Sequence, residues 1–499
     1  MKNLNLCTDA WLPVRMKTGE CATVGLIELF EKASDILDLV LASHERIAIM
    51  RLLVCIAQRA INGPNDLDDW EDSKDVFSEQ AVDYLQEWSS SFNLLGEDGA
   101  FLQAKDITPM EEKDWGDLAR LSMESAAGNN PTVFDNAAGT DRAVSLPQLA
   151  INLLTFQNFA PCGKIGVVKW RGVPTAQKSP DSVPAGPCCA SSAIHLFVCG
   201  ENLVETIWLN MCTQQSFENY RTGMGKPVWE YMPTHMGDEA AVINATQSYL
   251  GRLVPMSRSV KISLSGQHCL LGRGLTYPVY GDDKTLLFYE NTMSIKMEKK
   301  DGSRKIVGAN LNKAMWRSLP ALLHRFDSSN KSFALLSENE LPERYGIWIG
   351  ALVFDNAKVL GSMEDYYEHL GRNHVGAEAD KVQALLMSFA ARGVKLLTDA
   401  LKDYHISLKD SIKNKKTFYD HATENYWSGL TGYKSLYLLA LGSAAKPELF
   451  AEKLDEWLAC ICREAERVFD LMAAHNTVRQ LGAWAQTRKK LPTVKSLKR

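Results

Sequence analysis

Residues 9–15 read Asp-Ala-Trp-Leu-Pro-Val-Arg, residues 52–58 read Leu-Leu-Val-Cys-Ile-Ala-Gln, and residues 106–111 read Asp-Ile-Thr-Pro-Met-Glu. Apolar residues flank the turn sequence Lys-Thr-Gly-Glu at 17–20, which predicts a β-hairpin around the first stretch. The second stretch lies within residues 43–61, where apolar side chains cover most of the helical circumference. That distribution predicts a helix buried almost all round. None of the three stretches carries catalytic groups, so their value lies in their order and spacing.

Composition and charge narrow the class of protein. The chain has 499 residues, of which 45% are hydrophobic and 23% charged, as in ordinary globular proteins. This length exceeds what one core usually supports, so two or three domains are expected. Lys and Arg number 55 against 60 Asp and Glu, for a net charge of -5. Because a protein that binds duplex DNA alone is usually basic, any DNA contact here is expected through local basic patches within a larger assembly.

Cysteine usage indicates a reducing compartment. The 11 cysteines are irregularly spaced and form no Cys-x-x-Cys pair, which disfavours both a disulfide framework and a structural zinc site. Neither an N-terminal signal peptide nor a run long enough to span a bilayer is visible. We therefore expect a cytoplasmic protein with no membrane partner, no metal and no other cofactor.

The pattern of apolar residues divides the chain in two. Up to about residue 365, short strand-like runs alternate with turns and irregular stretches. Four segments with helical periodicity follow, near residues 385–401, 417–441, 450–472 and 475–489. The predicted fold class is α+β, with an irregular mixed N-terminal domain over residues 1–365 and a C-terminal four-helix bundle over residues 366–499.

The sequence lacks the common local signatures of catalysis. The run Gly-Met-Gly-Lys at 223–226 is followed by Pro227, where a phosphate-binding loop needs Ser or Thr. No Gly-x-Ser-x-Gly elbow or His-Glu-x-x-His pair occurs, and His268-Cys269 has no second pair at zinc-finger spacing. A non-enzyme is favoured, and a hydrolase whose site is not local in sequence is one alternative.

The three opening stretches resemble the large-subunit (CasA) family of the type I-E CRISPR Cascade surveillance complex. Members open with a strand of the form Asp/Asn-x-Trp-Ile-Pro-Val, followed by a buried helix with a Leu-Leu-Val-Cys-Ile-x-Gln core and an Asp-Val/Ile-Thr-Pro-Met-Glu turn. The resemblance implies a subunit that recognises the protospacer-flanking motif in target double-stranded DNA and helps to open the duplex for guide pairing. Its partners would be guide RNA, target DNA, the other Cascade subunits and a helicase-nuclease that it helps to recruit. The alternative from a different class is an assembly scaffold that contacts only protein and the guide-RNA end.

The resemblance also assigns a role to a long loop before a short apolar helix. Residues 128–144 occupy the place of the family's loop at the guide-RNA end of the complex. Asn130, Phe134 and Asn136 are therefore candidate contacts to RNA or a neighbouring subunit. Ser145 follows this loop and is expected to cap the helix.

A second loop, at residues 160–166, occupies the place of the family's glycine-rich loop along the minor groove of the flanking motif. Gly163 and Lys164 are the candidate DNA contacts, the first through its backbone and the second through a phosphate. This loop has fewer glycines than the family pattern, and a glycine that merely permits a turn is the other interpretation of Gly163.

Residues 350–360 look like the family's strand and turn that carry a duplex-opening wedge, which here gives Asp355 and Asn356. Asp355 departs from the pattern, because a carboxylate accepts but does not donate hydrogen bonds to base acceptors. A type I′ turn built on Asp-Asn is the alternative interpretation. The family's minor-groove lysine has no clear counterpart, and the residues near its place are Gln267, His268 and Arg273, of which Gln267 and Arg273 are the candidate DNA contacts.

Overall fold

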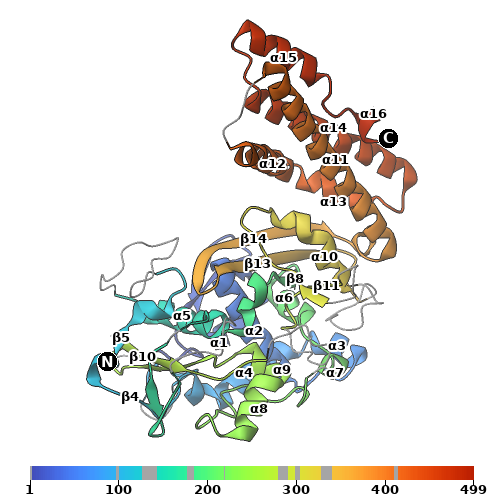
Figure 1. Ribbon diagram of the computed structural model, residues 1–499. Helices are drawn as coiled ribbons and strands as arrows, with labels where there is room; N and C mark the ends of the chain where they lie inside the picture. Colours follow the sequence, from blue (N-terminus) through green and yellow to red (C-terminus); the bar gives the residue numbers. More distant parts are fainter. Residues whose placement is uncertain are drawn as a thin grey trace. The chain divides into compact units, whose positions relative to one another are not determined.

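The computed structural model consists of two compact units (Figure 1). It describes residues 3–96, 100–125, 143–163, 165–176, 185–217, 220–278, 290–297, 304–326, 340–409 and 414–498. Within these ranges, the first unit comprises the residues up to 309 together with 345–368. The second unit comprises 310–326, 340–344 and the residues from 369 onward. Neither unit is one continuous stretch of chain, so a single boundary at 365/366 does not describe the division.

The first unit opens with the predicted hairpin, which a third strand extends. Strand β1 (Leu12–Met16) lies between β2 (Cys21–Val24) and β3 (Ile36–Leu39) and is antiparallel to both. Gly19 forms the hairpin turn with a φ of +90°, in the left-handed region that favours glycine. Helix α1 (Leu26–Glu31) connects β2 to β3.

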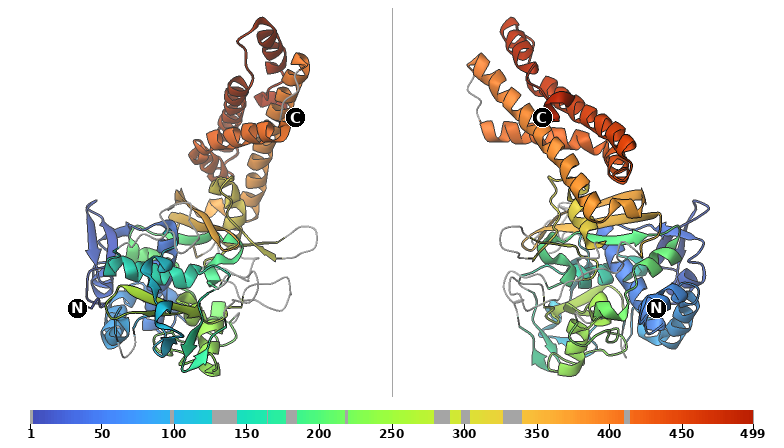
Figure 2. Two further views of the ribbon diagram at one scale, coloured as in Figure 1. Left: turned by 60° about the vertical axis from the view of Figure 1, so that its left-hand side comes forward. Right: turned by 90° about the vertical axis from the view of Figure 1, so that its right-hand side faces the viewer.

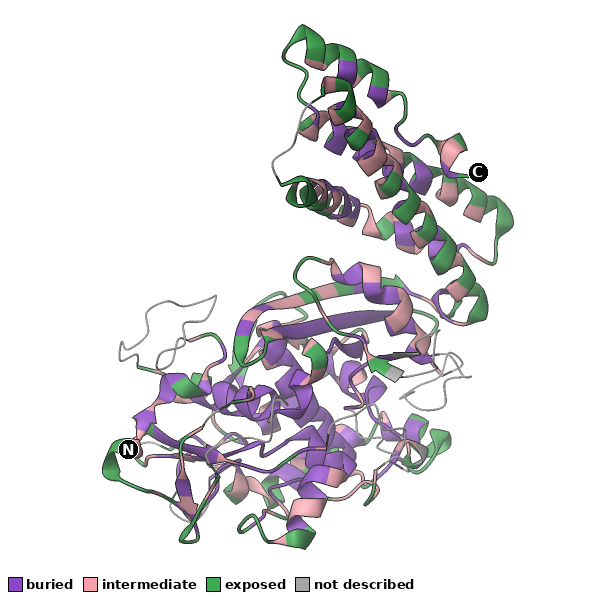
Figure 3. Ribbon diagram, in the orientation of Figure 1, coloured by how far each residue is buried: buried purple, intermediate pink, exposed green. Residues whose placement is uncertain are grey.

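Helix α2 (Ser43–Ala60) lies at the centre of the first unit's core. Every residue from 46 to 58 is buried, which confirms the prediction from the apolar pattern (Figure 3). The helix packs against α4 (Phe77–Glu87), α5 (Leu146–Phe159) and α9 (Tyr249–Leu253). The shorter helices of this unit are α3 (Leu67–Ser73), α6 (Leu203–Leu209), α7 (Gln214–Phe217) and α8 (Glu239–Gln247).

Small sheets make up the rest of the first unit as described. Their strand orders are β5-β10-β9, β4-β6-β7, β14-β13-β8 and β11-β12. The strands are β4 (Ile107–Pro109), β5 (Gly116–Asp117), β6 (Val168–Trp170), β7 (Val173–Pro174), β8 (His195–Cys199), β9 (Arg258–Ile262), β10 (His268–Arg273), β11 (Ile295–Met297), β12 (Arg304–Ile306), β13 (Tyr345–Asp355) and β14 (Lys358–Leu370). Strand β13 packs on α2, so its C-terminal end projects from a buried part of the unit.

The second unit is helical. Helix α11 (Ala377–Leu408) packs along α14 (Pro447–Met472) and α15 (Val478–Arg488), as the orange and red helices of Figure 2 show. Helices α12 (Lys415–Thr431) and α13 (Lys434–Gly442) pack against α14, and α16 (Val494–Leu497) follows near the C-terminus. The single helix expected at 417–441 is therefore two helices, separated at Gly432 and Tyr433. The predicted α+β class with a helical C-terminal region is confirmed.

A segment far from these helices in sequence completes their core. Residues 310–326 contain α10 (Leu319–Leu323) and Trp316, whose side chain is fully buried. The Trp316 ring centroid lies 5.4 Å from that of Tyr437, 6.1 Å from that of Trp427 and 6.2 Å from that of Trp457. Aromatic pairs at these separations stabilise a core beyond the area they bury.

Candidate nucleic-acid interface

The loop at 161–163 and the turn between β13 and β14 lie against each other. Asn356 and Ala357 form that turn. A Cβ built on Gly163 would lie 3.8 Å from the Cβ of Ala357, an ordinary van der Waals distance. Gly163 and Asn356 are both exposed. The structure thus brings together two segments that the sequence assigned separately to DNA.

Both segments have backbone conformations that suit their residues. Gly163 has a φ of +111°, which L side chains rarely adopt, and Asn356 has a φ of +52°, in the left-handed region that Asn tolerates. Since Asp355 has no positive φ, the type I′ turn built on Asp-Asn is wrong. Instead, the Asn356 Nδ2 donates to the Asp355 Oδ1 at 3.0 Å within an exposed turn.

Two arginines face each other beside the 161–163 loop. Arg258 begins β9 and pairs in register with Arg273 at the end of β10. The Arg258 side chain is 3% exposed, and its Nη2 donates to the carbonyl of Pro161 at 2.5 Å. Burial, and to a smaller extent Arg273, lowers the pKa of Arg258 to about 10.

Arg273 is half-buried, and its guanidinium has no hydrogen bond or ion pair with any residue in the described ranges. Within the described residues no carboxylate balances this charge, and a second cation lies beside it, which favours a positive local potential. A phosphate oxygen is the anion that such a site would bind on a nucleic acid.

Helix α5 and strand β9 fix the base of the 161–163 loop. Ser145 caps α5 as predicted, because its Oγ accepts from the Gln148 backbone N at 3.3 Å. At the other end of α5, the fully buried Gln157 accepts from the Arg258 backbone N at 2.9 Å and donates to the Arg258 carbonyl at 3.0 Å. The 161–163 loop therefore begins just after the point where α5 is hydrogen-bonded to β9.

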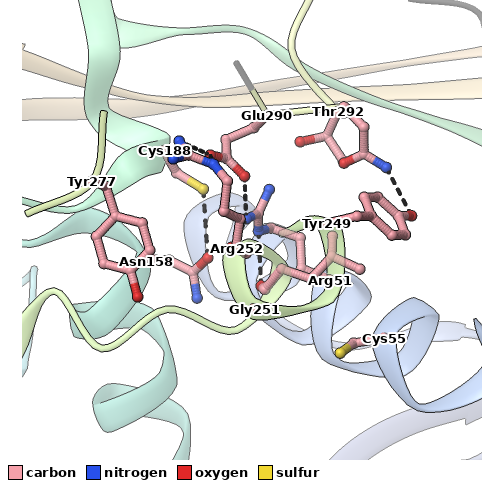
Figure 4. A network of polar contacts seen from close by, with 12 residues as sticks. Arg51, Cys55, Asn158, Cys188, Tyr249, Gly251, Arg252, Tyr277, Glu290 and Thr292 are labelled. Carbon is pink, nitrogen blue, oxygen red and sulfur yellow. Dashed lines mark hydrogen bonds and ion pairs between the residues drawn. The ribbon is translucent and has the colours of Figure 1, made fainter. Parts of the chain in front are cut away.

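A buried ionic cluster adjoins this end of α5 (Figure 4). The Glu290 carboxylate accepts from the Arg51 Nη2 at 2.5 Å and from the Arg252 Nη2 at 2.6 Å, and all three side chains are at most 2% exposed. Burial alone raises the pKa of Glu290, but the charges of Arg252 and Arg51 outweigh it and hold the pKa below its ordinary value. The Cys188 Sγ donates to the Asn158 Oδ1 at 3.4 Å in α5, beside the cluster.

The remaining predicted residues lie elsewhere. Gln267 is in the turn between β9 and β10, at the opposite end of that hairpin from Arg273, and its backbone N donates to the Ser263 Oγ at 3.3 Å. Because a strand rises about 3.3 Å per residue, Gln267 is not part of the cluster around Gly163. Lys164 and the three loop residues Asn130, Phe134 and Asn136 lie outside the described residues.

Arg258 is the residue of this candidate site that sequence reasoning missed. It lies between two serines at the edge of a short strand, a context that usually indicates an exposed arginine. Its partners Pro161 and Arg273 are distant in sequence, so no local pattern marks the contact. Only the pairing of β9 with β10, and the return of α5 beside them, brings the three residues together.

A membrane-spanning helix and a cluster of metal ligands each have structural requirements that can be compared with the described ranges. No helix there is both long and apolar enough to cross a membrane. No group of three or more His, Cys, Asp or Glu side chains within the same ranges is arranged to hold a metal ion. Within the candidate site, the Asp355 carboxylate accepts a hydrogen bond from the Asn356 side-chain amide.

Comparison with known proteins gives the family. The model of the CRISPR-associated protein Cse1 family matches residues 5–468. The CRISPR-associated protein CasA/Cse1 of Thermus thermophilus is 26% identical over 511 residues, which cover 98% of this chain and 95% of the relative. A crystal structure of Thermus thermophilus CasA has a TM-score of 0.75 at 19% identity and 99% coverage of both chains. A chain of a CRISPR RNA-guided surveillance complex has a TM-score of 0.68 at 16% identity, with 98% of this chain and 99% of that chain covered. A family model that spans nearly the whole sequence shows that this chain belongs to the CRISPR-associated protein Cse1 family.

Proposed function

We propose that the chain is the large subunit of a cytoplasmic CRISPR RNA-guided surveillance complex. In this role it recognises the protospacer-flanking motif in target double-stranded DNA, helps to open the duplex for guide pairing and helps to recruit the helicase-nuclease. Membership in the Cse1 family supports the assignment, as does the similarity of its fold to a chain of such a complex. Guide RNA and the other subunits are the partners that this role requires.

The single observation that carries the DNA-reading part is the closeness of Gly163 and Ala357, since a Cβ built on Gly163 would lie 3.8 Å from the Ala357 Cβ. It joins a loop whose glycine lets a duplex approach the backbone to a turn whose Asn356 amide is exposed. Arg273 is paired in register with Arg258 beside this loop, and its guanidinium has no counter-charge among the described residues, which suits it to a phosphate. Backbone and cation position the duplex, and the turn inserts at the base pair next to the motif.

No bond is broken in this function. The process exchanges DNA–DNA base pairs for guide–target base pairs. Because the two duplexes have similar stability, the protein needs to supply only a small part of the free energy of opening. The net charge of -5 fits a reader that is held on DNA by its complex, since the chain alone offers little long-range attraction to phosphates.

The test compares complexes assembled with the wild-type chain, with Arg273→Met, and without this chain. Affinity is measured for duplexes that share the target but differ in the flanking motif. We expect the wild-type complex to prefer one motif and the complex without the chain to lose the preference. If the complex without this chain still preferred one flanking motif, the chain would act as an assembly scaffold and not as the DNA reader.

A further inference from the structure

We propose that Arg258 is a positioning residue, whose buried guanidinium holds the 161–163 loop by the Pro161 carbonyl and so keeps Gly163 beside Ala357. This inference rests on the proposed function and adds to it the element that sets the geometry of the DNA-facing surface. It predicts that Arg258 acts on DNA only through the loop, whereas Arg273 acts directly.

The contact is placed where it controls the loop. Pro161 is the second residue after α5, and Gly163 follows two residues later, so the loop is short between its anchor and its tip. The Nη2 of Arg258 lies 2.5 Å from the Pro161 carbonyl oxygen, a charge-assisted hydrogen bond in a buried site. Only a few backbone torsions separate the Pro161 carbonyl from Gly163, so this hydrogen bond restricts where Gly163 can lie.

Arg258 is itself held firmly. Gln157 bonds both its backbone N and its carbonyl, and a Cβ built on Gly274 would lie 2.5 Å from the Arg258 Cα. Loss of the guanidinium therefore releases the loop while β9 stays in place.

The chemistry of the site also favours a role beyond stability. A buried cation has a desolvation cost, and here a second cation, Arg273, faces it across the strands. An uncharged donor would hold the carbonyl without that repulsion. A phosphate bound at the half-buried Arg273 would reduce this repulsion.

The first experiment measures alkylation of Cys162 in the isolated full-length chain, resolved by peptide mass spectrometry. Cys162 is half-buried in the loop and reports its position. We expect Arg258→Met to speed its alkylation roughly tenfold, as expected for loss of a charge-assisted bond. Arg46→Met is the matched control, because it removes another buried arginine of the same unit that bonds Asp38 instead. Arg258→Lys keeps the cation with one donor atom and should fall between wild type and Arg258→Met.

The second experiment measures binding of the assembled complex to duplexes with the preferred and an altered flanking motif, over a range of salt concentrations. Arg258→Met should reduce the preference roughly tenfold, with the salt dependence unchanged. Arg273→Met should instead weaken both duplexes and lower the salt slope by about one, the signature of one lost phosphate contact.

Two results would overturn the inference. Unchanged Cys162 alkylation in Arg258→Met and Arg258→Lys would show that the bond does not hold the loop. A lowered salt slope in Arg258→Met would show that Arg258 contacts phosphate itself. Failure of the proposed function looks different: the wild-type complex would show no motif preference, whatever the alkylation rates.

Discussion

Gly163 and Ala357 lie side by side, with 3.8 Å between the Ala357 Cβ and the position of a Cβ on Gly163. This closeness places the loop after α5 next to the turn after β13, and both α5 and β13 pack against α2 in the core. A duplex that touches one of these ends is therefore within reach of the other. This relationship makes a loop and a turn, far apart in sequence, into one candidate surface.

The first prediction concerns the backbone of Gly163. Gly163→Ala should destabilise the chain by about 1–2 kcal/mol, because its φ of +111° is unfavourable for an L side chain. It should also reduce the motif preference of the assembled complex, since the added methyl group would lie 3.8 Å from the Ala357 Cβ and occupy space between the loop and the turn. Thermal unfolding and duplex binding are the two measurements.

The matched control for Gly163 is Gly19→Ala. Gly19 also has a positive φ, +90°, and a Cβ there meets no atom within 4 Å. The two variants should lose similar stability, and only Gly163→Ala should lose motif preference. Equal loss of preference in both would mean that stability alone explains the effect.

The second prediction concerns the buried cluster around Glu290. Glu290→Gln should destabilise the chain by roughly 3–5 kcal/mol at neutral pH, because it removes the carboxylate that pairs with the buried Arg51 and Arg252. Glu28→Gln is the control, since Glu28 pairs with Lys32 on an exposed helix surface and should change stability little.

The cluster also predicts a pH dependence. The pKa of Glu290 is lower in the folded state than in the unfolded state, so its contribution is present above the unfolded value and is lost as pH falls through the folded value. The difference in stability between wild type and Glu290→Gln should therefore shrink below about pH 4, near the ordinary pKa of Glu. Melting temperatures of both proteins measured from neutral to acidic pH check this; a constant difference would contradict it.

The third prediction concerns the core of the helical unit. Trp316→Ala should destabilise that unit by about 3–5 kcal/mol, because the side chain is fully buried among Trp427, Tyr437 and Trp457. Leu439→Ala, at a position that is 60% exposed in the same unit, should have little effect. Hydrogen exchange of α11 to α15 is the measurement. Unchanged protection in Trp316→Ala would mean that residues 310–326 are not part of this core.

Sequence patterns predicted the fold where a local signal is sufficient. The all-round apolar surface of α2, the glycine in the first hairpin and the Ser145 cap are properties of a few adjacent residues, and each is confirmed. Trp316 shows the limit of such reasoning. Nothing around it in sequence indicates that its partners lie more than a hundred residues later, so the two-part composition of the helical unit emerged only from the structure.

The residues of the candidate site were predicted only in part from the sequence. Family resemblance singled out Gly163, Asn356 and Arg273, and the structure places the first two together with Arg273 nearby. Arg258 had no signal, because its role depends on the pairing of β9 with β10 and on a carbonyl from another loop. The assignment of any of these residues to DNA remains a prediction.

The last prediction concerns Asn356 as a wedge. Its amide is exposed at the tip of a turn that follows the buried strand β13. An amide placed under the base pair next to the motif would replace lost base contacts, and its removal would leave an unstacking cost of a few kcal/mol uncompensated. Asn356→Ala should slow opening of linear duplex targets. It should matter much less on targets already unpaired beside the motif, or under negative supercoiling, because these supply the opening energy in another way.

Asn356→Gly separates the wedge from the turn. Asn356 has a φ of +52°, so alanine adds backbone strain of about 1 kcal/mol that glycine relieves, and both variants lack the amide. If Asn356 acts as a wedge, the Asn356→Gly variant should keep the wild-type melting temperature, and its complex should still open paired targets slowly. If Asn356 only supports the turn, Asn356→Gly should restore both the rate of duplex opening and the stability that Asn356→Ala loses. Equal defects of Asn356→Ala on paired and pre-opened targets would also rule out the wedge, because a residue that acts at strand separation has no role once the strands are apart.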